Sequence, residues 1–243
     1  MASNPPGDCC ATGFRHEGTP AGEIKDIDGV KTYISYPKEK TDKAVFVVSD
    51  IFGIFINGQL VADEFAKAGY LAVLPDLFQG DQIKLEDQAA GKVNLPVWLK
   101  DHQPSHVDPV IASTIKYLRE EQGIKRIAGA GYCFGAKYTA RFLKEGQLDV
   151  GYMATPSFVT EEELAAIGGP LSISAAQTDH IFTTELRHKS EDILIKNGQS
   201  WQINLYGGVS HGFAIRTDLS IKHNKFAKEQ AFYQAVAWFN QYL

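Results

Sequence analysis

The sequence has few cysteines, little excess charge and no long apolar segment. Three cysteines in 243 residues are too few, and odd in number, for a disulfide framework, so we expect a reducing, cytoplasmic location. The 24 lysines and arginines against 29 aspartates and glutamates give a net charge of -5, which disfavours binding to nucleic acid or to anionic lipid. The N-terminus lacks the basic and apolar regions of a secretory signal.

The apolar runs that are present have the length of β-strands. One of the longest, Ala44–Val48, is far shorter than the roughly 20 residues that a membrane helix needs, so no membrane association is expected. The 22 glycines and 10 prolines are close to ordinary usage, which excludes collagen-like and disordered chains. The composition therefore predicts an ordinary globular protein.

Strand-like runs alternate with amphipathic segments of helical length. This alternation predicts a single α/β domain over residues 1–243, with a mostly parallel sheet and helices on both faces. Residues 22–27 and 30–36 meet at Asp28-Gly29, a pair typical of tight turns, so an antiparallel N-terminal hairpin is expected. Further strands are expected at 44–49, 70–74, 125–130, 149–153, 170–176 and 201–206, and helices at 57–69, 106–121, 160–166, 183–197 and 222–242.

Two segments lack clear periodicity. Residues 1–20 are expected to form a loosely packed N-terminal arm. Residues 76–104 connect two elements of the predicted domain, and so long a connection in a compact domain is usually functional. We therefore interpret residues 76–104 as one wall of a pocket.

A candidate nucleophile, Cys133, lies where a predicted strand passes into a predicted helix. It is flanked by glycines in the pattern G-x-C-x-G over residues 131–135, which is the pattern of a nucleophile elbow. The helix N-terminus would lower the pKa of the thiol, and the amide of Phe134 would be one oxyanion-hole donor. The alternative is a buried, inert cysteine at a strand end.

An acid and a base follow two later strands. Asp179 comes directly after the strand predicted at 170–176, and His211 follows the strand predicted at 201–206. The resulting order of nucleophile, acid and base is typical of α/β-hydrolases. His211 would transfer protons, and Asp179 would orient its imidazole. The alternatives are a helix N-cap for Asp179 and a loop contact for His211.

With these motifs the sequence resembles the dienelactone hydrolase (carboxymethylenebutenolidase) family, particularly its fungal-type branch. The resemblance implies an α/β-hydrolase fold without a metal or other cofactor. It also implies hydrolysis of a small-molecule ester or lactone through a Cys-His-Asp triad. The segments that resemble the family are Ser49–Gly53, Gly69-Tyr70, Leu74–Phe78, Gly131–Ala136, Thr178-Asp179 and Ser210–Phe213. The N-terminal motifs that resemble the fungal branch are Cys9-Cys10, His16–Gly18 and Pro20-x-Gly22.

The resemblance also implies further site residues. The amide of Ile51 matches the family's second oxyanion donor. Asp50 stands where bacterial members carry a glutamate that holds the thiol proton at rest. Arg216 lies one residue further from the catalytic histidine than the family's carboxylate-binding arginine, so it either reaches the site or is a solvated loop residue. Gln79 replaces a second arginine.

Aromatic residues near predicted strand ends indicate an aromatic, lactone or otherwise weakly charged substrate, although each of them can instead belong to the core. These candidate contacts are Phe52, Phe78, Trp98 and Phe213.

Two alternatives to an esterase remain open. A glutaminase-like amidotransferase also uses a cysteine at such a turn, but its acid follows the histidine by two residues, where this chain has Phe213. A non-catalytic α/β-hydrolase scaffold could serve as a binding protein. A zinc site at Cys9, Cys10 and His16 is not expected, since a fourth ligand and the usual cysteine spacing are missing. The sequence does not define an oligomeric state.

Overall fold

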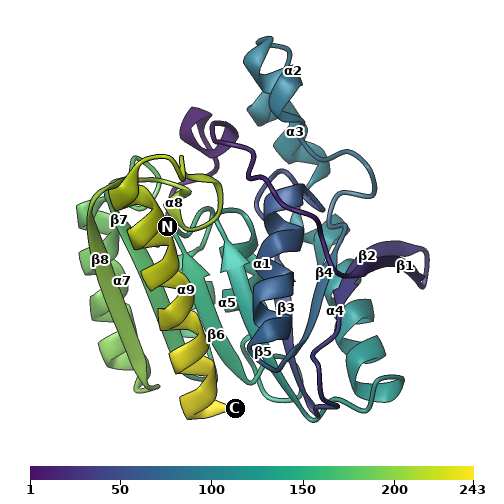
Figure 1. Ribbon diagram of the computed structural model, residues 1–243. Coiled ribbons are helices and arrows are strands. Elements are labelled where there is room, and N and C mark those ends of the chain that lie inside the picture. Colours follow the sequence, from purple (N-terminus) through teal and green to yellow (C-terminus); the bar gives the residue numbers. More distant parts are fainter.

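An eight-stranded sheet forms the centre of the computed structural model, which describes residues 1–243 except for the side chain of Asp8 (Figure 1). The strand order is β1-β2-β4-β3-β5-β6-β7-β8, with parallel pairing from β4 to β8 and antiparallel pairing of β2 with β1 and β4. The predicted α/β class is confirmed. The strands are β1 (Glu23–Ile27), β2 (Val30–Ser35), β3 (Lys43–Val48), β4 (Leu71–Pro75), β5 (Arg126–Tyr132), β6 (Val150–Ala154), β7 (Leu171–Thr178) and β8 (Trp201–Ser210).

The predicted N-terminal hairpin forms as expected. Asp28 and Gly29 both have positive φ, 51° and 82°, as a two-residue hairpin turn with the twist of its strands requires. The amide of Gly29 donates a hydrogen bond to Oδ1 of Asp26 at 2.8 Å, which closes the turn.

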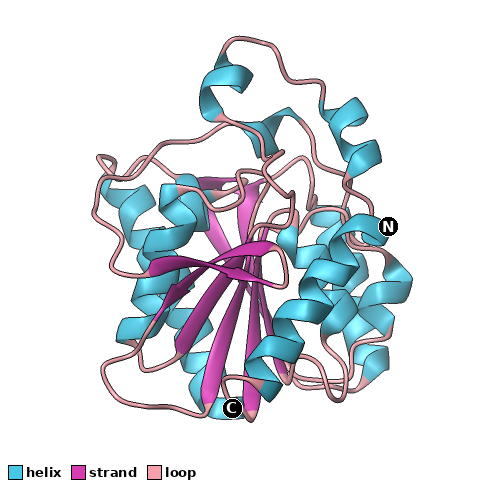
Figure 2. Ribbon diagram, turned by 90° about the vertical axis from the view of Figure 1, so that its right-hand side faces the viewer, coloured by secondary structure: helices cyan, strands magenta, loops and turns pink.

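Helices cover both faces of the sheet (Figure 2). Each face of the sheet has its own hydrophobic core. Alternate residues of β3 belong to different cores, because successive side chains of a strand point to opposite faces. Val45 and Val47 pack with α1 and α9, whereas Phe46 and Val48 pack with α4, α5 and α7. The helices are the 3-10 turn η1 (Asp8–Ala11) and α1 (Ile56–Lys67), α2 (Leu85–Ala89), α3 (Leu95–Asp101), α4 (Pro104–Glu120), α5 (Gly135–Phe142), α6 (Glu161–Ala165), α7 (Thr184–Asn197), α8 (Phe213–Arg216) and α9 (Lys222–Tyr242).

Most predicted boundaries lie within one or two residues of the observed ones, but the strand expected at 201–206 is too short. β8 continues to Ser210, where it pairs with Thr178 after an irregularity in the register beside Ala176. Gly207 and Gly208 read as loop residues in the sequence. The positive φ of Gly208, 71°, and the register shift instead allow the strand to continue to the residue before His211.

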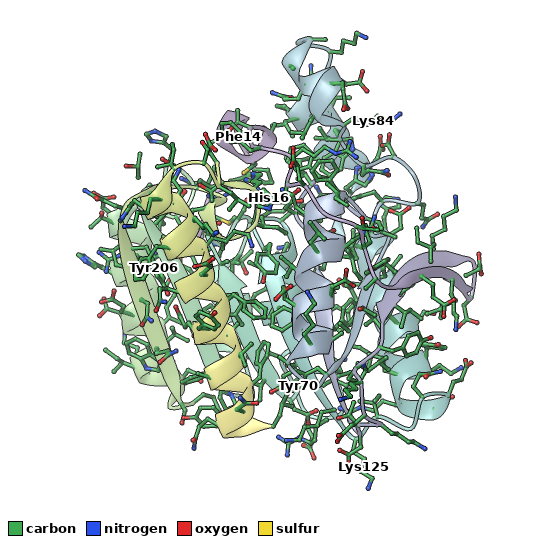
Figure 3. The ribbon with its side chains drawn as sticks, viewed as in Figure 1. Phe14, His16, Tyr70, Lys84, Lys125 and Tyr206 are labelled. Carbon is green, nitrogen blue, oxygen red and sulfur yellow. The ribbon has the colours of Figure 1, made fainter. Side chains whose placement is uncertain are left out.

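The N-terminal segment is packed against the domain, so the prediction of a loosely packed arm is wrong. The amide of Ala2 donates to the carbonyl of Val159, and the amide of Phe14 donates to the carbonyl of Arg216, both at 2.9 Å. Cys10 and Ala11 are 0% and 1% exposed. Gly13 allows this close packing, because a Cβ there would lie 2.6 Å from Cδ of Arg216. Figure 1 shows the segment in purple near α8, and Figure 3 shows Phe14 and His16 along it.

Residues 76–104 form the projection that carries α2 and α3, where Figure 3 labels Lys84. A groove of about 470 Å³ lies along it, lined by residues between Asp81 and Asp101. The interpretation of the segment as a pocket wall stays a prediction. Within the described part of the chain, no helix has both the length and the apolar character needed to cross a bilayer.

Candidate active site

Cys133 occupies a strained turn between β5 and α5. Its φ of 50° lies in the left-handed region, which costs a non-glycine residue about 1–3 kcal/mol. The flanking glycines are required by close packing. A Cβ on Gly135 would lie 2.1 Å from the carbonyl oxygen of Val48, and one on Gly131 would lie 2.3 Å from Oγ1 of Thr139. This is the geometry that the G-x-C-x-G pattern predicts.

The imidazole of His211 lies between Cys133 and Asp179. Its Nε2 is 3.2 Å from Sγ of Cys133, and its Nδ1 is 2.9 and 3.0 Å from the two oxygens of Asp179. The side chains of His211 and Asp179 are each 1% exposed. The structure therefore brings together the three residues that the sequence assigned to nucleophile, base and acid, from the ends of β5, β7 and β8.

The carboxylate of Asp179 is held by backbone amides as well as by the imidazole. Its Oδ1 accepts hydrogen bonds from the amides of Ile181 and Phe182, at 2.8 and 2.9 Å. Thr183, not Asp179, is the N-cap of α7. The N-cap alternative for Asp179 is wrong, and these bonds orient its oxygens toward His211.

The electrostatics favour a thiolate next to an imidazolium. Burial raises the pKa of the Cys133 thiol, but a hydrogen bond from Cys10 and the charge and hydrogen bond of His211 outweigh burial and bring that pKa well below its usual range. Burial lowers the pKa of His211, but the Cys133 charge and the Asp179 hydrogen bond raise it to about 10. A thiolate at Cys133 is the reactive form of a cysteine nucleophile.

Asp50 and Arg216 form a buried ion pair beside this centre. Nη1 of Arg216 donates to Oδ2 of Asp50 at 2.7 Å, and both side chains are less than 10% exposed. The amide of Phe52 donates to the other carboxylate oxygen at 3.1 Å. Arg216 thus reaches the site despite its extra residue of spacing. Among the described contacts, Cys133 meets Cys10 and His211 rather than Asp50.

The two predicted oxyanion donors, the amides of Ile51 and Phe134, follow the neighbouring parallel strands β3 and β5. Val48 pairs with Gly131 in the register, so the two strand ends lie side by side. Within the described part of the chain, neither amide donates a hydrogen bond to another residue. Both residues are fully buried. Unpaired buried amides at this position are suited to a developing negative charge.

The four aromatic residues predicted to contact the substrate lie in different parts of the structure. Phe78 and Trp98 lie 4.9 Å apart between ring centroids, and both contact Phe134. The ring of Phe52 lies 5.8 Å from the guanidinium of Arg216. Phe213 instead packs against Tyr206 in the core on the α9 side of the sheet. Phe213 also lines a cavity that includes His211, whereas Trp98 lines the groove along residues 76–104.

Cys10 is the site residue that the sequence reasoning missed. Its Sγ lies 3.4 Å from Nε2 of His211, and the Sγ atoms of Cys10 and Cys133 and this nitrogen all lie within 4.8 Å of one another. His16 is elsewhere, with its Nε2 2.9 Å from the carbonyl oxygen of Thr217. The only signal in the sequence was that Cys9-Cys10 lies in the N-terminal segment that resembles the fungal branch of the family.

The sheet topology and the nucleophile elbow define an α/β-hydrolase fold. The family model described as "Dienelactone hydrolase family" matches residues 30–243, so the chain belongs to the dienelactone hydrolase family. It is an enzyme of that type, a carboxylic ester or lactone hydrolase.

Similar proteins cover nearly the whole chain. "Hydrolase pyvD" of Aspergillus violaceofuscus is 47% identical, covering 100% of this chain and 99% of its own. "Dienlactone hydrolase 1" of Gibberella moniliformis is 31% identical, with coverage of 97% and 93%. A solved Klebsiella pneumoniae structure named for the dienelactone hydrolases has a TM-score of 0.76 at 17% identity, covering 93% of this chain and all of its own. The predicted family and fold are confirmed.

Proposed function

We propose that the protein hydrolyses a small-molecule ester or lactone with Cys133 as nucleophile, His211 as proton-transfer group and Asp179 as the residue that orients it. The observation that carries this proposal is the contact of 3.2 Å between Sγ of Cys133 and Nε2 of His211 at a strained turn. The carboxylate that follows β7 completes the arrangement. That position differs from the amidotransferase pattern, where the acid follows the histidine.

The reaction follows from these positions. The Cys133 thiolate attacks the carbonyl carbon, and the amides of Ile51 and Phe134 stabilise the oxyanion. The C–O bond breaks as the leaving oxygen takes the proton from His211, which leaves a thioester. Water then gives a proton to His211 and attacks the thioester, which releases the acid and the sulfur. Loss of one oxyanion donor typically costs about 3 kcal/mol of transition-state stabilisation.

Cys133 is favoured over Cys10 as the nucleophile. Both sulfurs lie near the same nitrogen, at 3.2 and 3.4 Å. Cys133 precedes a free amide at the start of α5, whereas Cys10 belongs to a short 3-10 turn. The hydrogen bonds of Cys10 to Cys133 and Cys9, together with burial, raise the pKa of Cys10 far above its usual range. A thiol in that state is a poor nucleophile at neutral pH.

Substrate access requires movement of the N-terminal segment. Cys133 is 1% exposed and Cys10 is fully buried over it. A cavity of about 300 Å³ beside the site is lined in part by Thr12, Gly13 and His211, but the imidazole itself is only 1% exposed. We infer that the segment around Cys10 moves aside when a substrate binds.

The proposed substrate is weakly charged. Arg216 is already paired with Asp50, and Gln79 stands where the resemblance places another arginine. Phe52, Phe78 and Trp98 offer apolar contact area. A cytoplasmic location belongs to the same proposal, because it would keep the three free cysteines reduced.

A matched substrate panel tests this proposal. Purified protein should hydrolyse neutral aryl esters and lactones with a higher kcat/KM than the same compounds carrying a carboxylate. Preference for the carboxylate-bearing compounds would contradict the substrate assignment. Absence of turnover across the whole panel would favour a binding protein on the same fold.

A further inference from the structure

We propose that Cys10, Cys133 and His211 form a Zn²⁺ site, and that the bound ion stops hydrolysis by occupying the nucleophile and the base. The three donor atoms come from η1, the β5–α5 turn and the residue after β8. They lie within 4.8 Å of one another, and all three residues are buried. Thiolates and imidazoles bind Zn²⁺ in preference to alkaline-earth ions, which bind oxygen ligands instead.

The distances fit a tetrahedral zinc ion. With Zn–S bonds of about 2.3 Å and Zn–N bonds of about 2.0–2.1 Å, the sulfur-to-nitrogen edges of a tetrahedron are about 3.5 Å. Here these edges measure 3.2 Å from Cys133 and 3.4 Å from Cys10. The two sulfur-to-nitrogen edges would therefore lengthen by only a few tenths of an ångström to admit the ion.

The outer contacts also fit a metal site. A histidine that binds zinc through Nε2 usually donates its Nδ1 proton to a carboxylate or carbonyl, which orients the ring. His211 already has the Asp179 carboxylate at 2.9 Å from Nδ1. Two thiolates balance the charge of Zn²⁺, and the adjacent Arg216 and Asp50 balance each other. The Asp179 carboxylate beside His211 then leaves the loaded centre with one net negative charge.

The resting centre holds a thiol at Cys10, a thiolate at Cys133 and an imidazolium at His211. Binding of one Zn²⁺ forms two Zn–S bonds and one Zn–N bond and releases two protons. Water supplies the fourth ligand. Hydrolysis stops because neither Cys133 nor His211 is then free to react.

Cys9 provides a matched control. It is only partly buried and does not belong to the group of three donors, and a serine at this position can keep the side-chain hydrogen bond to Cys10. A Cys9→Ser variant removes a thiol of the same type from the same segment. If zinc binds through nonspecific thiol contacts, Cys9→Ser and Cys10→Ser should weaken binding equally.

The test uses the full chain, kept reduced with a phosphine, with Co²⁺ as a spectroscopic probe and Zn²⁺ as its competitor. We expect one equivalent of Co²⁺ to produce thiolate-to-cobalt charge-transfer absorption and tetrahedral d–d bands, both removed by Zn²⁺. Cys10→Ser should bind Zn²⁺ at least about 100-fold more weakly, since changes outside the ligand shell already cost about 10- to 100-fold. Cys9→Ser should bind like the unchanged protein.

The proposal fails if the unchanged protein gives no charge-transfer band, or if Cys10→Ser binds Zn²⁺ as tightly as Cys9→Ser. Because Cys10 is fully buried, Cys10→Ala serves as a second variant, and circular dichroism confirms that each variant is folded. The spectroscopic signal does not depend on turnover. A protein that binds zinc but hydrolyses no ester would therefore contradict the proposed function and leave the metal site intact.

Discussion

The strand ends and the N-terminal segment bring side chains to the same imidazole in different ways. Cys133, Asp179 and His211 follow three parallel strands whose hydrogen-bonded register places their ends together. Cys10 reaches Nε2 of His211 from a 3-10 turn held by contacts with distant loops. The catalytic centre is thus built on the sheet, and it is covered by a packed segment that, under the proposed function, moves aside without disturbing the sheet.

The largest expected effect comes from removing the strand-borne sulfur. Cys133→Ala should lower kcat by at least about 10⁵-fold, because loss of a covalent nucleophile removes the reaction path and leaves only binding and the oxyanion donors. Steady-state hydrolysis of a neutral aryl ester measures this loss. Cys9→Ser is the control and should keep its activity. If Cys133→Ala remains active, the nucleophile lies on the covering segment instead.

A stability effect should follow from the glycine that lets α5 approach β3. Gly135→Ala would place a Cβ 2.1 Å from the carbonyl oxygen of Val48, so backbone must shift. We expect a loss of about 3 kcal/mol in the free energy of unfolding. For a chain of this size, Tm should fall by roughly 6–12 °C in calorimetry.

Gly168→Ala is the matched control for that substitution. Its added Cβ would meet its nearest neighbours at 3.7 Å, which is ordinary contact. Its Tm should therefore change little. Equal Tm values for Gly135→Ala and Gly168→Ala would show that the elbow is not held by close packing.

A smaller effect should come from loosening the covering segment. Asn57 donates to the carbonyls of Phe14 and Ile215 and accepts from the amide of His16, at 2.8–3.0 Å. Asn57→Ala should favour the displaced segment by about 1–2 kcal/mol, since hydrogen bonds contribute about 1 kcal/mol each. Alkylation of Cys133 by iodoacetamide, followed by peptide mapping, should become about tenfold faster.

Asn197→Ala is the control for the covering segment. Asn197 also makes three hydrogen bonds to backbone groups, but to Ala165, Ile167 and Gln199, away from the N-terminal segment. Alkylation of Cys133 should be unchanged in this variant. An equal acceleration in both variants would mean that general loosening, and not displacement of the segment, exposes the sulfur.

Site residues that follow the parallel strands could be predicted from the sequence, whereas those on the N-terminal segment could not. Cys133, Asp179 and His211 can be predicted because each follows a predicted strand, and the carboxyl ends of parallel strands meet at one edge of a sheet. Cys10 was not found, because the position of a short turn depends on tertiary contacts that leave no periodic pattern. The spacing between Arg216 and His211 does not decide whether Arg216 reaches the site. The short helix α8 places Arg216 next to Asp50.

Trapping of the acyl-enzyme identifies the nucleophile. The protein is mixed with a slowly hydrolysed aryl ester and quenched in acid, and peptide mass spectrometry then locates the acyl group. Our account predicts a thioester on the peptide that contains Cys133, and its absence after Cys133→Ala. An acyl group on Cys10, or no acyl adduct during active turnover, would contradict it.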